Sequence, residues 1–309
     1  MENERNIQRN TPARGNRTMF FLLLYLIVGQ LVFAGILMIL GMEGMVANAF
    51  VFVLLLFVPF LFYLLFTRQS HKRVLKWKPL GKTNALLVLG LTIALFPFVH
   101  VVSRLSAFVF FPVINEYLMD ITAYPLWFGL LSIAVFPALF EEFLFRGALY
   151  KEFERLPIQK VALITGLFFG IMHLNFHQFI YAGMMGVLYA YVLFYTQTIW
   201  APILMHFVHN ALATVLAYTQ PYSEWYAELW YNPPMYLLVY GGLSLAMLPV
   251  FVICFKKLKT RATVPPDEEM EEAVEPAEQK EKVFTWAFWL VLAIFLFFAG
   301  LIELSFRII

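Results

Sequence analysis

Residues 125–149 read PLWFGLLSIAVFPALFEEFLFRGAL and decide the fold of this chain. The run is long enough to cross a bilayer as a helix, which takes about 20 apolar residues. It nevertheless carries Glu141, Glu142 and Arg146. Ionisable groups in hydrocarbon are costly, so they usually face a protein interior or a wet cavity and mark function. The stretch therefore predicts both a membrane-spanning helix and a buried polar site on that helix.

The composition of the whole chain indicates a polytopic membrane protein. Of its 309 residues, 61% are hydrophobic and only 14% are charged, which is far too apolar for a soluble globular domain. Apolar runs of spanning length lie at about 18–41, 46–67, 84–102, 125–149, 160–176, 178–196, 199–218, 234–255 and 284–305. We therefore predict an all-α polytopic transmembrane helix bundle with about eight to nine spans.

Positive charge alternates along the connections between these runs. Lys and Arg gather in the N-terminal tail, at 68–83, at 150–160 and after 255. The connections at 42–45, 103–124 and 219–233 hold one Arg and no Lys. Because Lys and Arg mark cytoplasmic loops, we expect a multi-pass cell-membrane protein with a cytoplasmic N-terminus.

The first polar cluster places its two carboxylates in different surroundings. Glu142 and Arg146 are four residues apart and share a helix face, which predicts an ion pair. Glu141 is rotated by roughly 100° and has no cationic partner at that spacing. An unpaired carboxylate in a low-dielectric cavity can exchange protons near neutral pH and serve as a general base. The alternative is that these charges merely reach interfacial water at the cytoplasmic end of a span.

The second cluster, Phe169-Gly170-Ile171-Met172-His173, lies near the end of the next run. Glu141 and His173 are each 16 residues from Pro157, which lies in the turn between the two runs. In an antiparallel helix pair of equal rise, equal distance from the turn means equal depth, so the two side chains are expected to meet. The alternative for a lone histidine in a membrane helix is an interhelical hydrogen bond.

The third cluster is His206-Phe207-Val208-His209-Asn210. His206 and Asn210 share a helix face. His209 follows His206 by three residues, so the sequence leaves open which histidine faces the site. Interhelical hydrogen bonding is again the alternative for each residue by itself. Three polar residues at an earlier connection, Asn175, His177 and Gln178, are expected at the membrane interface.

Together the three motifs resemble the CPBP family, which includes the CAAX prenyl protease type II enzymes of the Rce1 kind and the bacterial Abi-type membrane proteins. The family pattern is Glu-Glu-x-x-x-Arg, then Phe-x-x-x-His, then His-x-x-x-Asn or a close variant. The chain matches it in order and separation, and Phe-Glu-Glu-Phe-Leu-Phe-Arg-Gly at 140–147 is typical of the family. The resemblance covers about residues 125–218.

The resemblance implies an intramembrane glutamate-dependent endopeptidase. In that picture Glu141 is the base that activates a water, helped by His173. His206 and Asn210 would form the oxyanion hole. The supporting residues would be Glu142, Arg146 and Phe169. The substrate would be a membrane-associated or lipidated peptide or protein, reached from the cytoplasmic side or laterally.

The resemblance and the residues together suggest a division of the chain. It comprises a cytoplasmic basic tail (1–17), three accessory spans (18–124), a CPBP-like catalytic core (125–218), an additional span (219–255), a charged cytoplasmic linker (256–283) and a final span (284–309). The linker combines several prolines with many glutamates, which is typical of a solvated spacer.

Two other interpretations of the site stay open. A zinc site built from Glu141, His173 and His206 is chemically possible, because these residue types are zinc ligands. The chain has no His-Glu-x-x-His helix and no Gly-x-Ser-x-Gly elbow, so we expect a site without a metal or cofactor. We also expect no nucleic acid as a partner. The second alternative is a non-enzymatic membrane protein that only binds a peptide, of the bacteriocin self-immunity type.

Overall fold

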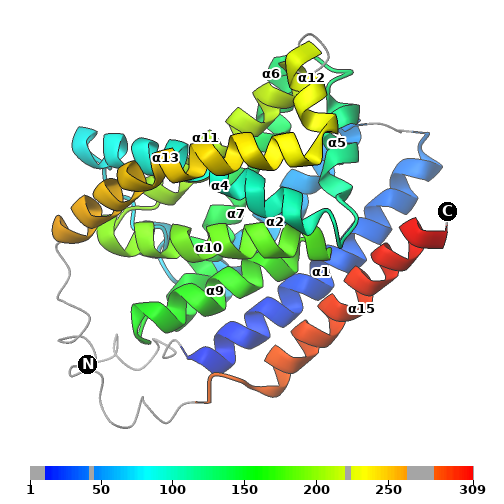
Figure 1. Cartoon of the computed structure of the whole chain (residues 1–309). Coiled ribbons are helices and arrows are strands. Elements are labelled where there is room, and N and C mark those ends of the chain that lie inside the picture. Colours follow the sequence, from blue (N-terminus) through cyan, green and yellow to red (C-terminus); the bar gives the residue numbers. More distant parts are fainter. Residues whose placement is uncertain (1–10, 42–44, 220–223, 263–281, 309) are drawn as a thin grey trace, which may run out of the picture.

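The computed structural model describes residues 11–41, 45–219, 224–262 and 282–308 (Figure 1). Its elements are, in chain order, α1 (Pro12–Ile39), α2 (Met45–Thr67), α3 (His71–Val74), α4 (Lys82–Ser106), α5 (Val113–Ile121), α6 (Leu126–Gly129), η1 (Leu130–Val135), α7 (Phe136–Glu142), η2 (Phe143–Leu149), α8 (Tyr150–Phe153), α9 (Ile158–Met172), α10 (Phe176–Thr196), α11 (Trp200–Thr219), α12 (Glu224–Tyr231), α13 (Pro233–Thr260) and α15 (Trp286–Ile308). The elements η1 and η2 are π-helical. The described ranges contain no strand.

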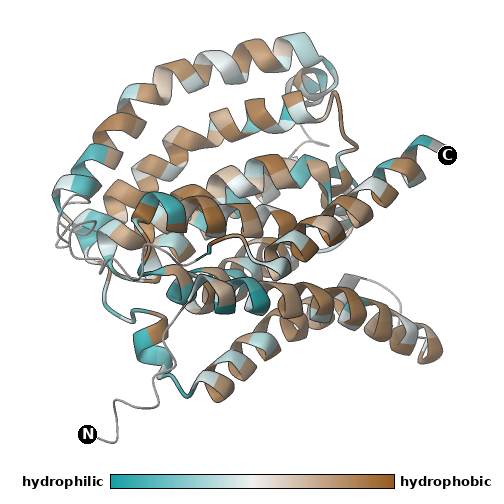
Figure 2. Ribbon diagram, turned by 90° about the horizontal axis from the view of Figure 1, so that it is seen from below, coloured by the Kyte–Doolittle hydropathy of each residue, from teal (hydrophilic) through white to brown (hydrophobic). Residues whose placement is uncertain are grey.

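Within these ranges, eight helices or unbroken helical runs are long and apolar enough to cross a membrane. Figure 2 shows hydrophobic residues along most of the length of the long helices. Each of the nine predicted apolar runs forms a helix, but α9 has only 15 residues and is too short to be counted with the others. The prediction of an all-α, multi-pass membrane bundle is therefore confirmed.

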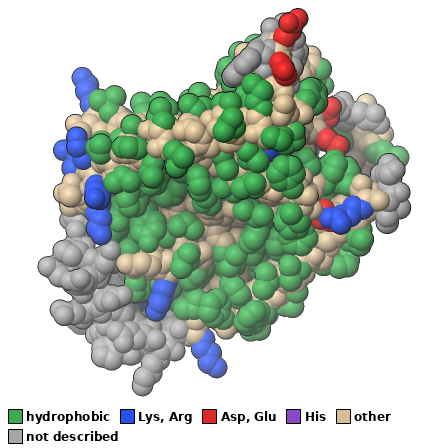
Figure 3. All heavy atoms as spheres, in the orientation of Figure 1, with side chains coloured by type: hydrophobic (Ala, Val, Ile, Leu, Met, Phe, Trp, Pro, Cys, Tyr) green, Lys and Arg blue, Asp and Glu red, His purple; other side chains and the backbone are tan. Residues whose placement is uncertain are grey.

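The two ends of the bundle differ in charge. One end carries the basic connection at 68–81, the connection at 154–157 and the basic end of α13. The other end carries α5 and α12, with the exposed acids Glu116, Asp120, Glu224 and Glu228. Figure 3 shows most Lys and Arg side chains at the left end and Asp and Glu at the upper right. We call these ends the basic face and the opposite face.

The helix α1 begins six residues earlier than the run predicted from hydrophobicity. Thr11 caps it, because its side chain accepts a hydrogen bond from the Arg14 backbone N–H at 3.2 Å. The Arg14 guanidinium then donates to both oxygens of Glu152 on α8, at 2.5 and 2.7 Å. The Tyr63 hydroxyl of α2 donates to the same carboxylate at 2.6 Å. Part of the predicted tail is thus folded and joins three helices at the basic face.

The helices α1 and α15 lie side by side at one flank of the bundle (Figure 1). The Asn16 side chain donates to the Val283 carbonyl at 2.6 Å, which ties the start of α1 to the approach of α15. The remaining parts of the predicted tail and linker, residues 1–10 and 263–281, lie outside the described residues.

The helices α9 and α10 approach closely because glycines line their contact. Gly166 and Gly170 of α9 face Gly183 and Gly186 of α10. A Cβ added at Gly186 would lie 2.9 Å from the Gly166 Cα, nearer than side chains pack. Small residues let helix backbones approach in membranes, where packing rather than the hydrophobic effect drives association. This close approach brings the backbone of α10 within reach of side chains on the motif-bearing span.

Candidate active site

The two motif carboxylates lie where an α-helical segment meets a π-helical one. The membrane-spanning run Leu126–Phe153 is unbroken, but η1 and η2 flank its central segment α7. Hydrogen bonds from i to i+5 are rare in proteins and occur frequently at functional sites. Glu141 and Glu142 are the last two residues of α7, and they are 5% and 0% exposed. Both carboxylates are therefore inside the protein.

Glu142 and Arg146 form the ion pair that their spacing predicts. Arg146 Nε lies 3.3 Å from Glu142 Oε2, and both side chains are fully buried. The guanidinium also donates to the Gly186 carbonyl of α10 at 2.6 Å. It lies over the rings of Phe169 and Tyr189, at 4.6 and 5.1 Å from their centroids. The arginine thus compensates the charge of Glu142 and joins η2 to α9 and α10.

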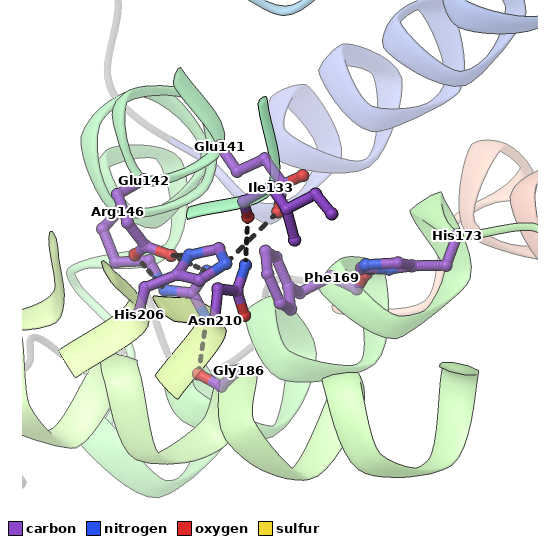
Figure 4. Close-up of polar contacts among 9 residues, drawn as sticks. All are labelled: Ile133, Glu141, Glu142, Arg146, Phe169, His173, Gly186, His206 and Asn210. Atoms are coloured by element: carbon purple, nitrogen blue, oxygen red, sulfur yellow. Dashed lines mark hydrogen bonds and ion pairs between the residues drawn. The ribbon is translucent and has the colours of Figure 1, made fainter. Parts of the chain in front are cut away.

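His206 lies between the two carboxylates (Figure 4). Its Nδ1 is 2.9 Å from Glu142 Oε1, and its Nε2 is 3.9 Å from Glu141 Oε2. Its ring stacks on Tyr189, with centroids 5.2 Å apart and planes at 23°. A carboxylate that is paired with a guanidinium only accepts hydrogen bonds, so Nδ1 carries the proton and donates. In the neutral ring, Nε2 then presents a lone pair toward Glu141.

Glu141 and His206 are close enough for one water, lying beside the two atoms, to contact both. A separation of 3.9 Å is too long for a direct hydrogen bond. One water can bridge two polar atoms at such a distance. The arrangement can therefore hold a water between a carboxylate oxygen and an imidazole nitrogen.

The structure resolves which of the two neighbouring histidines faces the carboxylates. His209 lies on another side of α11, where its ring contacts Phe96 of α4 at 5.4 Å. Its Nδ1 is buried and has no hydrogen-bond partner in the described part of the chain. His206, and not His209, contacts the glutamates.

Asn210 is one turn from His206 on α11 and is held by the π-helical segment. Its side-chain N–H donates to the Ile133 carbonyl of η1 at 2.8 Å (Figure 4). Asn210 therefore lines the site with its amide fixed by backbone of the motif-bearing span.

The sequence predicted that His173 and Glu141 meet across the helix pair, and the structure shows no direct bond between them in the ranges it describes. The Nδ1 of His173 lies 2.9 Å from the Phe169 carbonyl, and the described residues show no hydrogen bond or ion pair between His173 and Glu141. The Phe169 ring contacts both histidines, at 5.4 Å from His173 and 5.8 Å from His206. Two residues at equal distance from the turn lie at equal depth only if both helices have the same rise per residue. The π-helical η2 lies between Glu141 and the turn, and its i to i+5 bonds wind more residues into each turn.

One cavity of about 720 Å³ joins the predicted site residues. Glu141, His173, His206 and Asn210 all line it. From the level of Glu141 the cavity extends toward the opposite face. There it is lined by the C-terminal parts of α4 and α11, the N-terminal part of α10, and residues of α5 and α12. Of the three residues expected at the membrane interface, His177 and Gln178 line this cavity. Asn175 and His177 are buried.

Toward the basic face the bundle is closed. The α2–α4 connection packs over this end, where the Thr198 hydroxyl donates to the Lys78 carbonyl at 2.5 Å. Lys76 donates to the Gln197 side chain at 3.0 Å and lies over the Tyr150 ring. Burial lowers the pKa of Lys76 to about 8. The cavity therefore extends away from the basic connections and not toward them.

The described residues contain no group of three or more His, Cys, Asp or Glu arranged to hold a metal ion. The zinc alternative required Glu141, His173 and His206 to converge. Only Glu141 and His206 do so, because His173 contacts the Phe169 backbone instead.

Three contributors to the site were not found from the sequence. They are the Tyr189 ring, the Gly186 carbonyl and the Ile133 carbonyl. Gly183, Gly186 and Tyr189 recur at three-residue spacing and so share one face of α10. The two glycines on this face were the available signal for a close helix contact. A backbone carbonyl such as that of Ile133 leaves no trace in the sequence.

Comparison with known proteins places the motifs in a family. Residues 122–212 match the family model described as Type II CAAX prenyl endopeptidase Rce1-like. The matched segment contains all three motifs. Neither a curated protein nor a solved structure matches the chain.

Proposed function

Because residues 122–212 match the Rce1-like family of prenyl endopeptidases, we propose that the chain is an intramembrane endopeptidase that uses a glutamate-activated water. It hydrolyses a peptide bond in a membrane-associated or lipidated peptide or protein. The observation that carries the proposal is the buried pair of Glu141 and His206, spaced for one water at the wall of a cavity.

The water would be held between Glu141 Oε2 and His206 Nε2. Glu141 takes one proton from it as general base. The water oxygen forms a bond to the carbonyl carbon of the substrate, and the carbon–nitrogen bond breaks as the proton passes to the leaving amine. His206 orients the water, since its ring is fixed through Nδ1 by Glu142. Glu142 therefore holds the imidazole that positions the water, much as the carboxylate of a catalytic triad holds its histidine.

Asn210 is the side chain we assign to the developing oxyanion. A preorganised amide N–H in a water-poor site stabilises negative charge more strongly than it would in water. His206 in its neutral form accepts at Nε2, so it is a poorer donor to an oxyanion than the resemblance implied. His173 forms part of the cavity wall and has no step in this scheme.

Product analysis by mass spectrometry tests the proposal directly. Candidate membrane peptides are incubated with purified wild type, with Glu141→Gln and with Glu303→Gln. Glu303 is a matched control, because it is a buried carboxylate on α15 that accepts from the Phe111 backbone N–H and does not line the cavity. Cleavage should fall by several orders of magnitude in Glu141→Gln and should stay close to the wild-type level in Glu303→Gln. Cleavage by the wild type should persist when a chelator is present.

Other outcomes separate the competing functions. Wild-type cleavage by Glu141→Gln would reject the base assignment. Abolition by a chelator and rescue by zinc would favour metal chemistry. Peptide binding without any product, unchanged in Glu141→Gln, would favour the peptide-binding immunity protein.

A further inference from the structure

Arg104 is a cation inside the cavity that the proposed chemistry does not use. It lies in the last turn of α4, near the opposite face. Among the described residues that line the cavity it is the single Lys or Arg, and Glu141 is the single acid. Arg104 also lies outside residues 122–212, so the family motifs do not account for it.

Among the described residues, Arg104 forms no ion pair that would match its charge. One Nη donates to the Trp230 carbonyl at 2.9 Å, and the guanidinium lies over the Tyr236 ring at 5.4 Å. Its Nε is buried and has no hydrogen-bond partner in the described part of the chain. Arg14 and Arg146, by contrast, each contact a buried carboxylate.

A charge in a poorly solvated position is costly unless it is paired. The C-terminal dipole of α4 and the aromatic rings offset part of that cost. The second Nη has no hydrogen-bond partner among the described residues and is not buried, so it remains for an acceptor in the cavity. A carboxylate suits the guanidinium, because it accepts two parallel hydrogen bonds from the guanidinium fork. The acids Glu116 and Asp120 on the rim are exposed, so salt screens them.

The depth of Arg104 relates it to the reacting groups. Phe96 of α4 contacts His209, and His206 is one turn further toward the basic face. Arg104 follows Phe96 by eight residues, toward the opposite face. If α4 and α11 are taken as roughly parallel, the separation from the Glu141 level is roughly 15 Å, or about four to five extended peptide residues.

We infer that Arg104 is a subsite that binds a carboxylate of the peptide whose scissile bond lies at Glu141. The inference rests on the proposed function and adds a substrate class, namely peptides with an acidic group about four to five residues from the cleaved bond. The carboxylate belongs either to the peptide C-terminus or to an Asp or Glu side chain. The peptide enters from the opposite face, since the cavity is closed toward the basic face.

Binding to an inactive protein tests this subsite apart from catalysis. The Glu141→Gln variant is titrated with three fluorophore-labelled apolar hexapeptides: a free acid, its C-terminal amide, and an amide with glutamate at the last position. Charge-assisted hydrogen bonds should make one or both acidic peptides bind about 10–100-fold more tightly than the neutral amide. Preference for the free acid alone identifies the C-terminus, and equal affinity of both acids identifies a side chain.

Substitution of Arg104 must remove that preference. Adding Arg104→Gln should equalise the three affinities, and Arg104→Lys should retain part of the difference. Arg307→Gln is the matched control, because Arg307 is a cation whose side chain is 66% exposed and which does not line the cavity. The melting temperature of each variant in the same detergent shows whether it folds.

The inference fails if no peptide binds, if acids and amide bind equally, or if the preference survives Arg104→Gln in a folded protein. The proposed function fails separately. If the acidic preference depends on Arg104 but the wild type forms no product from these peptides or from candidate substrates, the subsite stands and the endopeptidase does not.

Discussion

At the scale of single residues, the site depends on how two adjacent glutamates are kept different. Glu142 has the Arg146 guanidinium and the His206 Nδ1–H as partners. Glu141 has only the more distant Nε2 of the same histidine among the described residues. One carboxylate is thus held as a fixed anion, and the other keeps an oxygen for a reactant. His206 is the side chain that connects them.

We expect substitution of His206 to be far more harmful than substitution of His173. His206→Ala removes the group that orients the water, and the loss in kcat/KM should be about 10²–10⁴-fold. His173→Ala should lose less than about tenfold, because the His173 ring bonds to the Phe169 carbonyl and forms no hydrogen bond or ion pair with Glu141 among the described residues. The measurement is kcat/KM for both variants on one peptide. A larger loss at His173 would reinstate it as the helper of Glu141.

Arg146→Ala should destabilise the folded protein strongly. It leaves Glu142 buried with its charge uncompensated, at a cost of about 3–5 kcal/mol. Adding Glu142→Gln should restore part of that loss, because the amide oxygen still accepts from His206. Arg307→Ala removes a cation that is 66% exposed and lies 3.8 Å from Glu303, whose carboxylate keeps its hydrogen bond from the Phe111 N–H, so the cost should be less than about 1 kcal/mol. Thermal unfolding of the wild type and the three variants in detergent gives the comparison, and unchanged stability in Arg146→Ala would show that the pair is solvated.

At the scale of elements, the contact of α9 with α10 positions the arginine. Gly186→Ala places a Cβ 2.9 Å from the Gly166 Cα and 3.1 Å from an Arg146 nitrogen. Overpacking of this kind typically costs about 1–3 kcal/mol. It should also lower activity, because it displaces Arg146 from the Gly186 carbonyl.

Gly183→Ala is the control for that substitution. Its added Cβ meets its nearest neighbour, the Gly166 carbonyl oxygen, at 3.5 Å, which is ordinary contact. Stability and activity should stay close to wild type. Equal damage from both substitutions would mean that the whole contact, and not the space at Gly186, is what matters.

The helices themselves were predictable because apolar length is a local property. The pairing of Glu142 with Arg146 was predictable for the same reason, since a spacing of four depends on one helix only. The partner of Glu141 was not. It depends on the π-helical winding of η2, which displaces one arm of a hairpin relative to the other. The anchoring of Arg14 to Glu152 also escaped prediction, because it joins segments 138 residues apart.

At the scale of the whole molecule, the asymmetry of charge predicts how the bundle is oriented. The basic face should lie in the cytoplasm, because Lys and Arg disfavour translocation. A Cys254→Ser background removes the single native thiol. In intact cells, an impermeant maleimide should then label Glu228→Cys at the opposite face and spare Lys160→Cys at the basic face, both of which are exposed positions.

Permeabilised cells provide the control for that experiment, because both positions should be labelled once the membrane is open. The reverse pattern in intact cells would invert the orientation. It would also move the entrance of the cavity to the cytoplasm, without altering the contacts among Glu141, His206 and Arg146.

A chamber that is blocked beyond Glu141 has a kinetic consequence. None of the described residues of the basic connections lines the cavity, so we expect both fragments of a cleaved chain to leave by the opening through which the intact chain entered. The fragment nearer the entrance has to diffuse away before the deeper one is released, and the next molecule cannot enter until the chamber is vacant. Product release through the shared opening should therefore limit turnover, and accumulated fragments should inhibit the protein by occupying that opening.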